Sequence, residues 1–214
     1  MANVFVTGGT GYIGQRLIPE LLGRGHTVRA LVRDGSERKL PAGAIAVRGN
    51  PLDRATFADD VAPSDTFVQL VGVPHPSPSK AQQFRDVDLV SVTESAAAAR
   101  DAGVRHFVYL SVAQPAPVMR DYVAVRAEGE RLIRESGMAA TFVRPWYVLG
   151  PGHRWPYAIL PLYWLWRLNP KSRDTARRLY PVKLRSVVGA IADAVGAPPA
   201  GVRVIEAPEL RSRA

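Results

Sequence analysis

The sequence predicts an α/β fold in which a doubly wound parallel sheet carries helices on both faces. Two observations support this prediction. Short β-branched or aromatic runs alternate with helix-like runs, and a glycine-rich turn joins the first such pair. Because each strand is followed by a helix that crosses back over the sheet, the strands are expected to run parallel. The length suits one domain over residues 1–214, with residues 146–185 as a small C-terminal lobe on the substrate side.

The first strand and helix are the clearest of the predicted elements. Residues 4–14 read VFVTGGTGYIG, which is a strand followed by a turn and the start of a helix. Ile13, Leu17 and Leu21 then share one helical face, and Gly25 is placed to end the helix.

The same alternation continues along the chain. In this kind of sheet, ligands bind beyond the carboxyl ends of the strands, where the candidate site residues fall. Further strands are expected at 27–32, 44–48, 65–71, 106–111 and 140–143, with helices at 87–102 and 122–135 that Gly103 and Gly137 end.

Each glycine of the first turn has a mechanical reason. Gly8 or Gly9 makes a turn that a side chain would block, Gly11 lets a diphosphate approach the backbone, and Gly14 lets the helix pack closely on the strand. The free N–H groups and positive dipole end of the helix would then face the diphosphate. A tight turn without a ligand is the alternative, but the strand–turn–helix context favours a dinucleotide site.

Composition narrows the function classes. The absence of cysteine excludes disulfides, thiolate catalysis and Cys-ligated metals, and no His, Asp or Glu cluster has metal-ligand spacing, so no metal is expected. The net charge of +9 would suit a polyanion, but no run has the pattern of a nucleic-acid groove, so no nucleic-acid partner is expected. The N-terminus lacks the pattern of a signal peptide, which favours a cytoplasmic location.

Two stretches interrupt the α/β pattern. Residues 74–79 form a Pro/Ser loop that is expected to overhang the ligand site. Residues 155–166, WPYAILPLYWLW, are aromatic, uncharged and too short and proline-rich to span a bilayer, so no stable membrane span is expected. This segment is either a packed lobe, the wall of an apolar substrate pocket, or a surface that meets a membrane or a partner. We favour the lobe and pocket.

These motifs resemble the short-chain dehydrogenase/reductase superfamily, in its extended and atypical branches of NAD-dependent epimerase/dehydratase-like and NmrA-like NAD(P)-binding proteins. The resemblance covers nearly the whole chain and implies a Rossmann fold. It rests on residues 7–14, 102–111 and 144–152 and on Tyr122 with Arg126, while residues 180–195 and 202–209 resemble the family's last helix and strand.

The resemblance implies an NAD(P) cofactor. Arg33 ends the second strand where relatives hold a 2′-phosphate, assisted by Arg29 and Arg38, so NADP is preferred over NAD unless Asp34 turns inward. Asn50 replaces an Asp that contacts adenine, and Gly72 allows close approach of the cofactor. The implied cofactor-binding residues are Thr7, Gly8, Thr10, Gly11, Tyr12, Ile13, Gly14, Arg33, Asn50, Leu70, Val71, Gly72 and Pro145.

The resemblance also implies a catalytic set. Relatives use a Tyr that transfers the proton, a Lys four residues later and a Ser that holds the substrate oxygen, and these positions correspond here to Tyr122, Arg126 and Ser111. Arg keeps the charge of the Lys but carries no proton at ordinary pH, which puts the usual route in doubt. The substrate side is assigned to His75, Trp146 and His153.

Two functions compete on this basis. The first is an NADP-dependent oxidoreductase that transfers hydride to or from a small apolar carbonyl or enone substrate. The second is a non-catalytic NAD(P)-binding redox sensor or accessory subunit, which the replacement of Lys by Arg126 favours. A sugar-nucleotide epimerase ranks last because the C-terminal part is short. A homodimer is compatible with the superfamily, although no interface is identified.

Overall fold

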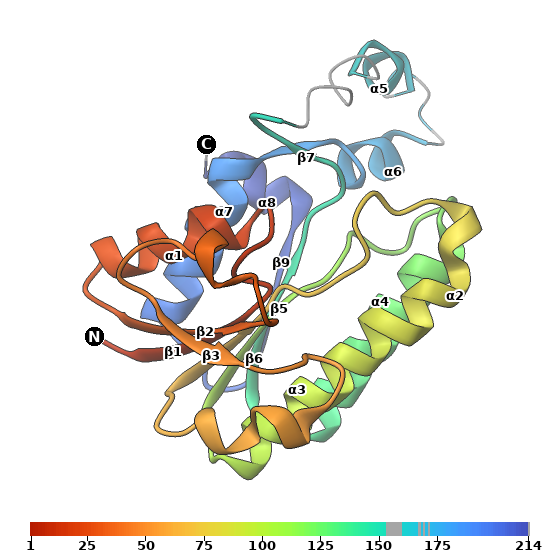
Figure 1. Ribbon diagram of the computed structural model, residues 1–214. Helices are drawn as coiled ribbons and strands as arrows, with labels where there is room; N and C mark the ends of the chain where they lie inside the picture. Colours follow the sequence, from red (N-terminus) through yellow and green to blue (C-terminus); the bar gives the residue numbers. More distant parts are fainter. Residues whose placement is uncertain (153–159, 167, 169, 171, 214) are drawn as a thin grey trace.

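A computed structural model describes all residues except 153–159, 167, 169, 171 and 214. Its centre is a seven-stranded parallel sheet in the order β3-β2-β1-β4-β5-β6-β9 (Figure 1). This order, with β1 at the switch point of the sheet, confirms the predicted doubly wound α/β fold. The strands are β1 (Asn3–Thr7), β2 (Thr27–Val32), β3 (Ile45–Arg48), β4 (Thr66–Gln69), β5 (His106–Leu110), β6 (Ala139–Arg144) and β9 (Val202–Glu206).

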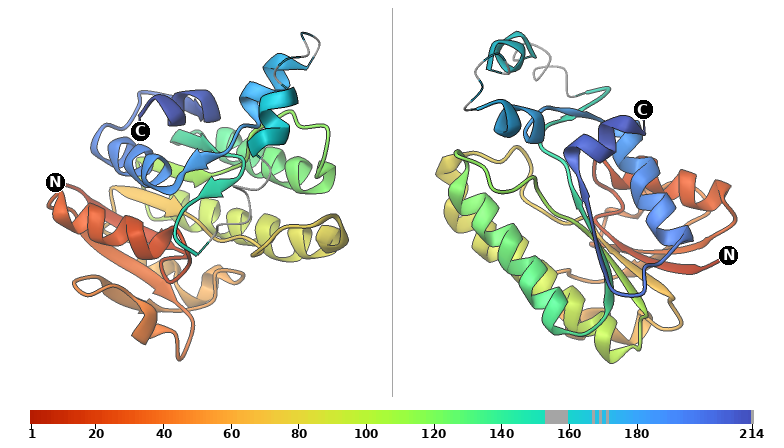
Figure 2. Two further views of the ribbon diagram at one scale, coloured as in Figure 1. Left: turned by 90° about the horizontal axis from the view of Figure 1, so that it is seen from above. Right: turned by 180° about the vertical axis from the view of Figure 1, so that it is seen from behind.

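Helices cover both faces of the sheet (Figure 2). One face carries α1 (Gly14–Gly23), α7 (Leu184–Gly196) and α8 (Ala207–Ser212). The other carries α2 (Ala81–Gln83), the π-helical turn η5 (Phe84–Leu89), α3 (Val90–Asp101) and α4 (Arg120–Glu135). The loops contain 3₁₀ turns at Glu37–Lys39, Arg54–Thr56, Ala58–Asp60 and Pro78–Lys80.

Strand alternation supplies a core to each face. Val4 and Val6 of β1 are fully buried beneath α1 and α7. Phe5, between them, points to the other face, where its ring packs 5.2 Å from that of Phe67, which stacks 5.1 Å from Phe107. Because neighbouring strands are in parallel register, these three phenylalanines form one row under α3 and α4.

The C-terminal lobe stands above the carboxyl ends of the strands (Figure 1). It contains the two-stranded sheet of β7 (Val148–Leu149) and β8 (Val182–Lys183), together with α5 (Leu160–Trp166) and α6 (Arg173–Arg178). Tyr163 of α5 is buried against Trp166 and Tyr180, with ring centroids 5.8 Å apart in both pairs. Within the described part of the chain, no helix has the length and apolar character needed to cross a bilayer.

Most predicted boundaries differ from the structure by one or two residues, and two differ more clearly. The last strand was expected to reach residue 209, but it ends at Glu206, and α8 begins at Ala207 with Pro208 in its first turn, where a missing N–H does no harm. The helix expected at 87–102 begins earlier, at Ala81, and passes through the π-helical turn before α3.

The first turn behaves as its glycines predict. Gly8 is the residue with a left-handed backbone, φ +74°, which settles the choice between Gly8 and Gly9 for the turn itself. A Cβ on Gly14 would lie 2.4 Å from the Gly8 carbonyl oxygen and 2.6 Å from the Gly9 Cα. The glycine at position 14 is therefore what allows α1 to start so close to β1.

We expect Gly14→Ala to destabilise the protein by about 2–3 kcal/mol, because the clash is with backbone that cannot move aside. Gly23→Ala, at the other end of α1, is the matched control: its Cβ would meet nothing within 4 Å, so a gain of about 0.5–1 kcal/mol is expected. Urea unfolding of both variants measures this. Equal stabilities would refute the packing role of Gly14.

Candidate active site

The glycine turn and the end of β4 meet at the carboxyl edge of the sheet. A Cβ on Gly8 would lie 3.0 Å from the Leu70 carbonyl carbon and 3.1 Å from the Val71 nitrogen, so the two predicted backbone segments touch. The Leu70 amide also donates to the Thr7 carbonyl at 3.2 Å. The edge therefore combines the start of α1 with two strand ends, which is the geometry that a diphosphate site requires.

Arg33 lies exposed directly after β2, and it forms no ion pair with any described residue. The expected helper Arg29 is committed elsewhere, because its guanidinium donates to the carbonyls of Asp60 and Ala62 at 2.9 and 2.5 Å. Asn50 is exposed, and its side-chain oxygen accepts the Leu52 amide at 3.1 Å, which leaves its NH₂ group and the second lone pair of the oxygen for an adenine edge.

Arg126 lies in a buried ion pair. Its side chain is 4% exposed, and one terminal nitrogen donates to Asp88 Oδ1 at 2.6 Å, while Asp88 itself is fully buried. The other terminal nitrogen donates to the Leu110 carbonyl at 2.8 Å. Burial alone lowers the pKa of Arg126, but Tyr122, Tyr109 and Asp88 more than offset this, so the net pKa is raised and the group stays charged.

Gly72 makes room for this guanidinium. A Cβ at position 72 would lie 2.1 Å from the terminal nitrogen of Arg126. We predicted that Gly72 provides space for the cofactor. The structure gives a different reason for the glycine, since the arginine occupies the space where a side chain would be.

A chain of hydrogen bonds extends the ion pair to the glycine turn. Asp88 Oδ2 accepts the Val73 amide at 2.9 Å, and the Asp88 carbonyl accepts from Ser91 at 3.1 Å. Gln69 donates to Ser91 at 3.0 Å, and the Gln69 oxygen accepts the hydroxyl of Thr7. Thr7 is fully buried, so its hydroxyl belongs to this chain and positions β1 against β4.

Tyr122 is half-buried beside Arg126. Its ring packs 5.0 Å from that of Phe84, and the guanidinium carbon of Arg126 lies 5.2 Å from the ring centroid. Burial raises the pKa of the Tyr122 hydroxyl; Arg126 opposes this shift and Asp88 adds to it. At neutral pH the phenol therefore keeps its proton and can serve as a donor.

Ser111 points to a second buried network. Its hydroxyl donates to Glu130 Oε1 at 2.6 Å, and the same oxygen accepts from Gln114 at 2.9 Å. Arg144 binds Glu130 through two nitrogens and reaches Glu206 at 2.7 Å. Because the single Ser111 proton is directed at a carboxylate, the serine oxygen has only lone pairs left for a ligand.

The residues assigned to the substrate side lie in different surroundings. His75 is exposed with φ +49°, in a loop that Lys80 holds through the carbonyls of Pro74 and His75. Trp146 packs in the aromatic cluster of the lobe, and the carbonyl of the buried Pro145 accepts the Ala113 amide. His153 lies outside the described residues. The assignment of His75, Trp146 and His153 to the substrate, and of Pro145 to the cofactor, stays a prediction.

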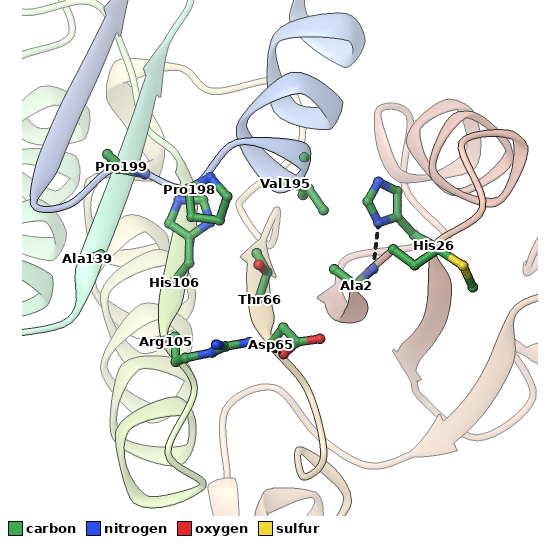
Figure 3. A pocket seen from close by; sticks show the side chains of 12 residues that line it. Ala2, His26, Asp65, Thr66, Arg105, His106, Ala139, Val195, Pro198 and Pro199 are labelled. Carbon is green, nitrogen blue, oxygen red and sulfur yellow. Dashed lines mark hydrogen bonds and ion pairs between the residues drawn. The ribbon is translucent and has the colours of Figure 1, made fainter.

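A separate pocket of about 360 Å³ opens at the opposite, amino end of the strands. His26, Thr66 and His106 line it, with Asp65 and Arg105 directed toward each other at its rim (Figure 3). It is remote from the glycine turn and shares none of the predicted site residues. Among the described residues, no group of acidic, His or Cys side chains could hold a metal ion.

A family model described as NAD(P)H-binding matches residues 8–155. The chain belongs to this family. The match includes the glycine turn, Arg33, Ser111, Tyr122 and Arg126, and it confirms both the resemblance inferred from the sequence motifs and NAD(P) as the cofactor class.

Individual relatives agree with this assignment. The chain is 28% identical over 170 residues to a 4-hydroxy-2-methyl-3-oxo-4-farnesyl-3,4-dihydroquinoline-1-oxide ketoreductase of Stigmatella aurantiaca, covering 69% of this chain and 51% of the relative. It is 30% identical over 159 residues to a ceramide reductase of Caulobacter vibrioides, covering 70% and 47%. The chain thus spans about half the length of the curated relatives it matches.

Solved structures show the same fold. The Bordetella bronchiseptica enzyme WbmH, in complex with NAD⁺, superposes with a TM-score of 0.70 at 20% identity, covering 96% of this chain and 75% of that one. At this level of identity the likeness concerns the fold alone.

Sequence analysis missed the partners of the site residues. The position of Glu130 beside the site was predictable from the sequence, because the i, i+4, i+8 spacing of Tyr122, Arg126 and Glu130 places all three on one face of α4. Asp88 comes from a different helix, 38 residues before Arg126, and its pairing depends on tertiary packing.

We expect Asp88→Asn to destabilise the protein by about 3–5 kcal/mol, because it leaves the Arg126 charge buried without a counter-ion. Asp101→Asn, on the same helix, removes exposed ion pairs to Arg54 and Arg100 and should change stability by less than about 1 kcal/mol. Urea unfolding compares the two. A loss below about 1 kcal/mol in Asp88→Asn would contradict the structural role of the pair.

Proposed function

We propose that this chain is an NAD(P)-dependent reductase that prefers NADPH and acts on a small apolar carbonyl or enone. The observation that carries the proposal is the convergence at one sheet edge of the glycine turn, the end of β4 and a tyrosine that keeps its proton. A reduction needs a hydride and a proton, and this edge offers a dinucleotide cradle next to a proton donor.

The residues present fit the cofactor. Because Gly14 has no side chain, it lies close to Gly8, and the N–H groups at the start of α1 would be accessible to a diphosphate. The exposed guanidinium of Arg33 suits a 2′-phosphate, which it would bind through bidentate charge-assisted hydrogen bonds. When bound, the cofactor supplies the hydride. Arg126 would not hold the ribose in the arrangement described here, since its side chain is only 4% exposed and its terminal nitrogens donate to Asp88 and Leu110.

Two residues of the chain would act on the substrate oxygen. Tyr122 would donate its phenolic proton to the substrate oxygen, and its raised pKa means that it acts as a donor, not as a phenolate base. Ser111, whose proton is directed at Glu130, would accept a hydrogen bond from the hydroxyl that forms when the substrate oxygen is protonated. The same geometry would position an alcohol product.

The relatives support an apolar substrate. Two of them are named as reductases of a farnesylated quinoline oxide and of ceramide, both with long apolar parts. The aromatic lobe, with Trp146 and Tyr163 in one cluster above the carboxyl edge, supports the same class here.

A second candidate, a nucleotide-binding protein without turnover, is favoured by one observation. The cation that usually assists the tyrosine is neutralised by a buried carboxylate, 2.6 Å away. Such a protein would bind NADPH and report the cofactor ratio, as a redox sensor or an accessory subunit.

Calorimetric titration with NADPH, NADP, NADH and NAD tests the cofactor preference. We expect Arg33→Ala to weaken NADPH binding about 10- to 100-fold while leaving NADH unchanged, because charge-assisted bonds to the 2′-phosphate are lost. Arg100→Ala, an exposed arginine on α3, is the control and should leave both affinities unchanged. Equal loss for NADPH and NADH in Arg33→Ala would disprove the role in 2′-phosphate selection.

A screen of small apolar ketones and enones with NADPH, followed by Tyr122→Phe, separates the two candidates. We expect kcat to fall about 10²- to 10⁴-fold in the variant with NADPH affinity preserved, because only the proton donor is removed. Turnover that survives in Tyr122→Phe would exclude proton transfer by this residue. NADPH binding without turnover of any substrate would support the non-catalytic candidate.

A further inference from the structure

Helix α5 and the turn residue Leu168 beyond its end carry an apolar stripe that faces away from the protein. Pro161, Leu165 and Leu168 follow one another at i, i+4 and i+7, and all three are exposed, the two leucines at 60% each. The helical spacing extends to Leu168 because its amide donates to the Leu165 carbonyl at 3.1 Å. Exposed leucines in a row call for an explanation, whereas isolated ones do not.

The opposite side of α5 attaches the helix to the lobe. Tyr163 is 7% exposed and packs with Leu179 and Ala113, and Trp166 joins the same cluster. Figures 1 and 2 show α5 standing out from the body of the molecule, with α6 beneath it. The aromatic side chains described here are thus used for packing, and the outward stripe is aliphatic.

The charge of the chain is concentrated in the same segment. Residues 153–185 hold eight of the 28 Lys and Arg residues and one of the 19 Asp and Glu residues, so this segment carries +7 of the net +9. Among the described cations, Arg173 and Arg177 are exposed on α6, which packs against α5. The only carboxylate in the segment is Asp174, 92% exposed.

We propose that the α5–α6 lobe docks on the surface of an anionic lipid bilayer. The exposed leucines would enter the boundary between headgroups and acyl chains, while Arg173, Arg177 and neighbouring cations bind anionic headgroups. This is peripheral binding, compatible with the absence of a membrane-crossing helix among the described residues. The inference goes beyond the proposed reaction, because docking requires neither cofactor nor turnover.

An anionic lipid surface matches the α5–α6 lobe better than nucleic acid or a second copy of the chain does. Nucleic acid would be recognised by exposed aromatic rings for stacking, but the outward stripe, as far as its side chains are described, consists of proline and leucine. A second copy of the lobe would bring two segments of +7 together, which charge repulsion disfavours. A bilayer satisfies both the apolar stripe and the positive charge at once.

Tryptophan fluorescence gives a direct measurement, because all four tryptophans of the chain lie within residues 146–166. The full chain is titrated with vesicles of phosphatidylcholine alone and of phosphatidylcholine with phosphatidylglycerol. Brominated lipids then test whether the lobe reaches acyl-chain depth. We expect quenching and co-sedimentation with the anionic vesicles only, reversed at about 1 M salt, where the Debye length is about 3 Å.

Variants separate the two contributions. Leu165→Gln with Leu168→Gln should abolish quenching by brominated lipid and weaken binding at least about tenfold. Arg173→Glu with Arg177→Glu should weaken binding at least about fivefold for each residue. The controls are Ile45→Gln, at a residue that is 50% exposed on the edge strand β3, and Arg100→Glu with Arg131→Glu on α3 and α4. NADPH affinity, unchanged in all variants, shows that the fold is retained.

Several outcomes would overturn the proposal. These are no binding to anionic vesicles, equal loss in the control variants, tighter binding to single-stranded DNA than to vesicles, or a dimer in sedimentation velocity that the leucine substitutions dissociate. Failure of docking leaves the reductase proposal untouched, since turnover of a water-soluble enone is measured without lipid. Loss of turnover in Tyr122→Phe likewise has no bearing on docking.

Discussion

The buried pair of Arg126 and Asp88 is the constraint on which the carboxyl edge of this sheet depends. The guanidinium holds the end of β5 through the Leu110 carbonyl, and the carboxylate holds the segment after β4 through the Val73 amide. Two charges at this depth lose their hydration, so each must keep its partner. The pair therefore fixes α4 relative to η5, and it explains why position 72 is glycine, since any side chain there would meet the arginine.

This constraint also limits the chemistry. A free cation beside a tyrosine favours the phenolate, but here a carboxylate neutralises the cation and burial raises the pKa of Tyr122. The Ser111 proton is likewise directed inward, to Glu130, which Arg144 holds. Tyr122 therefore keeps its proton at neutral pH, and the Ser111 proton has one direction. Such a site is better suited to donate a proton to a substrate that is being reduced than to remove a proton from an alcohol.

Much of this arrangement was predictable from the sequence, for reasons that lie in local physics. The turn at residues 7–14 depends on short-range sterics, which its four glycines indicate, and the parallel sheet follows from strand–helix alternation. The partners of the site residues were not predictable. Asp88 pairs with Arg126, which lies on a different helix. The sequence predicts that Arg29 assists in phosphate binding, but in the structure its guanidinium donates to two backbone carbonyls. The sequence shows where a charged residue lies in the chain, but not which buried group will form an ion pair or hydrogen bond with it.

The glycine turn and the lobe are in physical contact. A Cβ on Gly150, at the end of β7, would lie 2.5 Å from the Tyr12 hydroxyl and 3.0 Å from the Cβ of Leu184. Tyr12 belongs to the turn that is predicted to face the diphosphate, and Gly150 leads into the segment that carries the aromatic residues and most of the net charge. Packing this close transmits small displacements, because a well-packed interior has no void to absorb them. The segment that leads into the lobe is therefore packed directly on the turn that the sequence predicts to bind the cofactor, and the position of one restricts the position of the other.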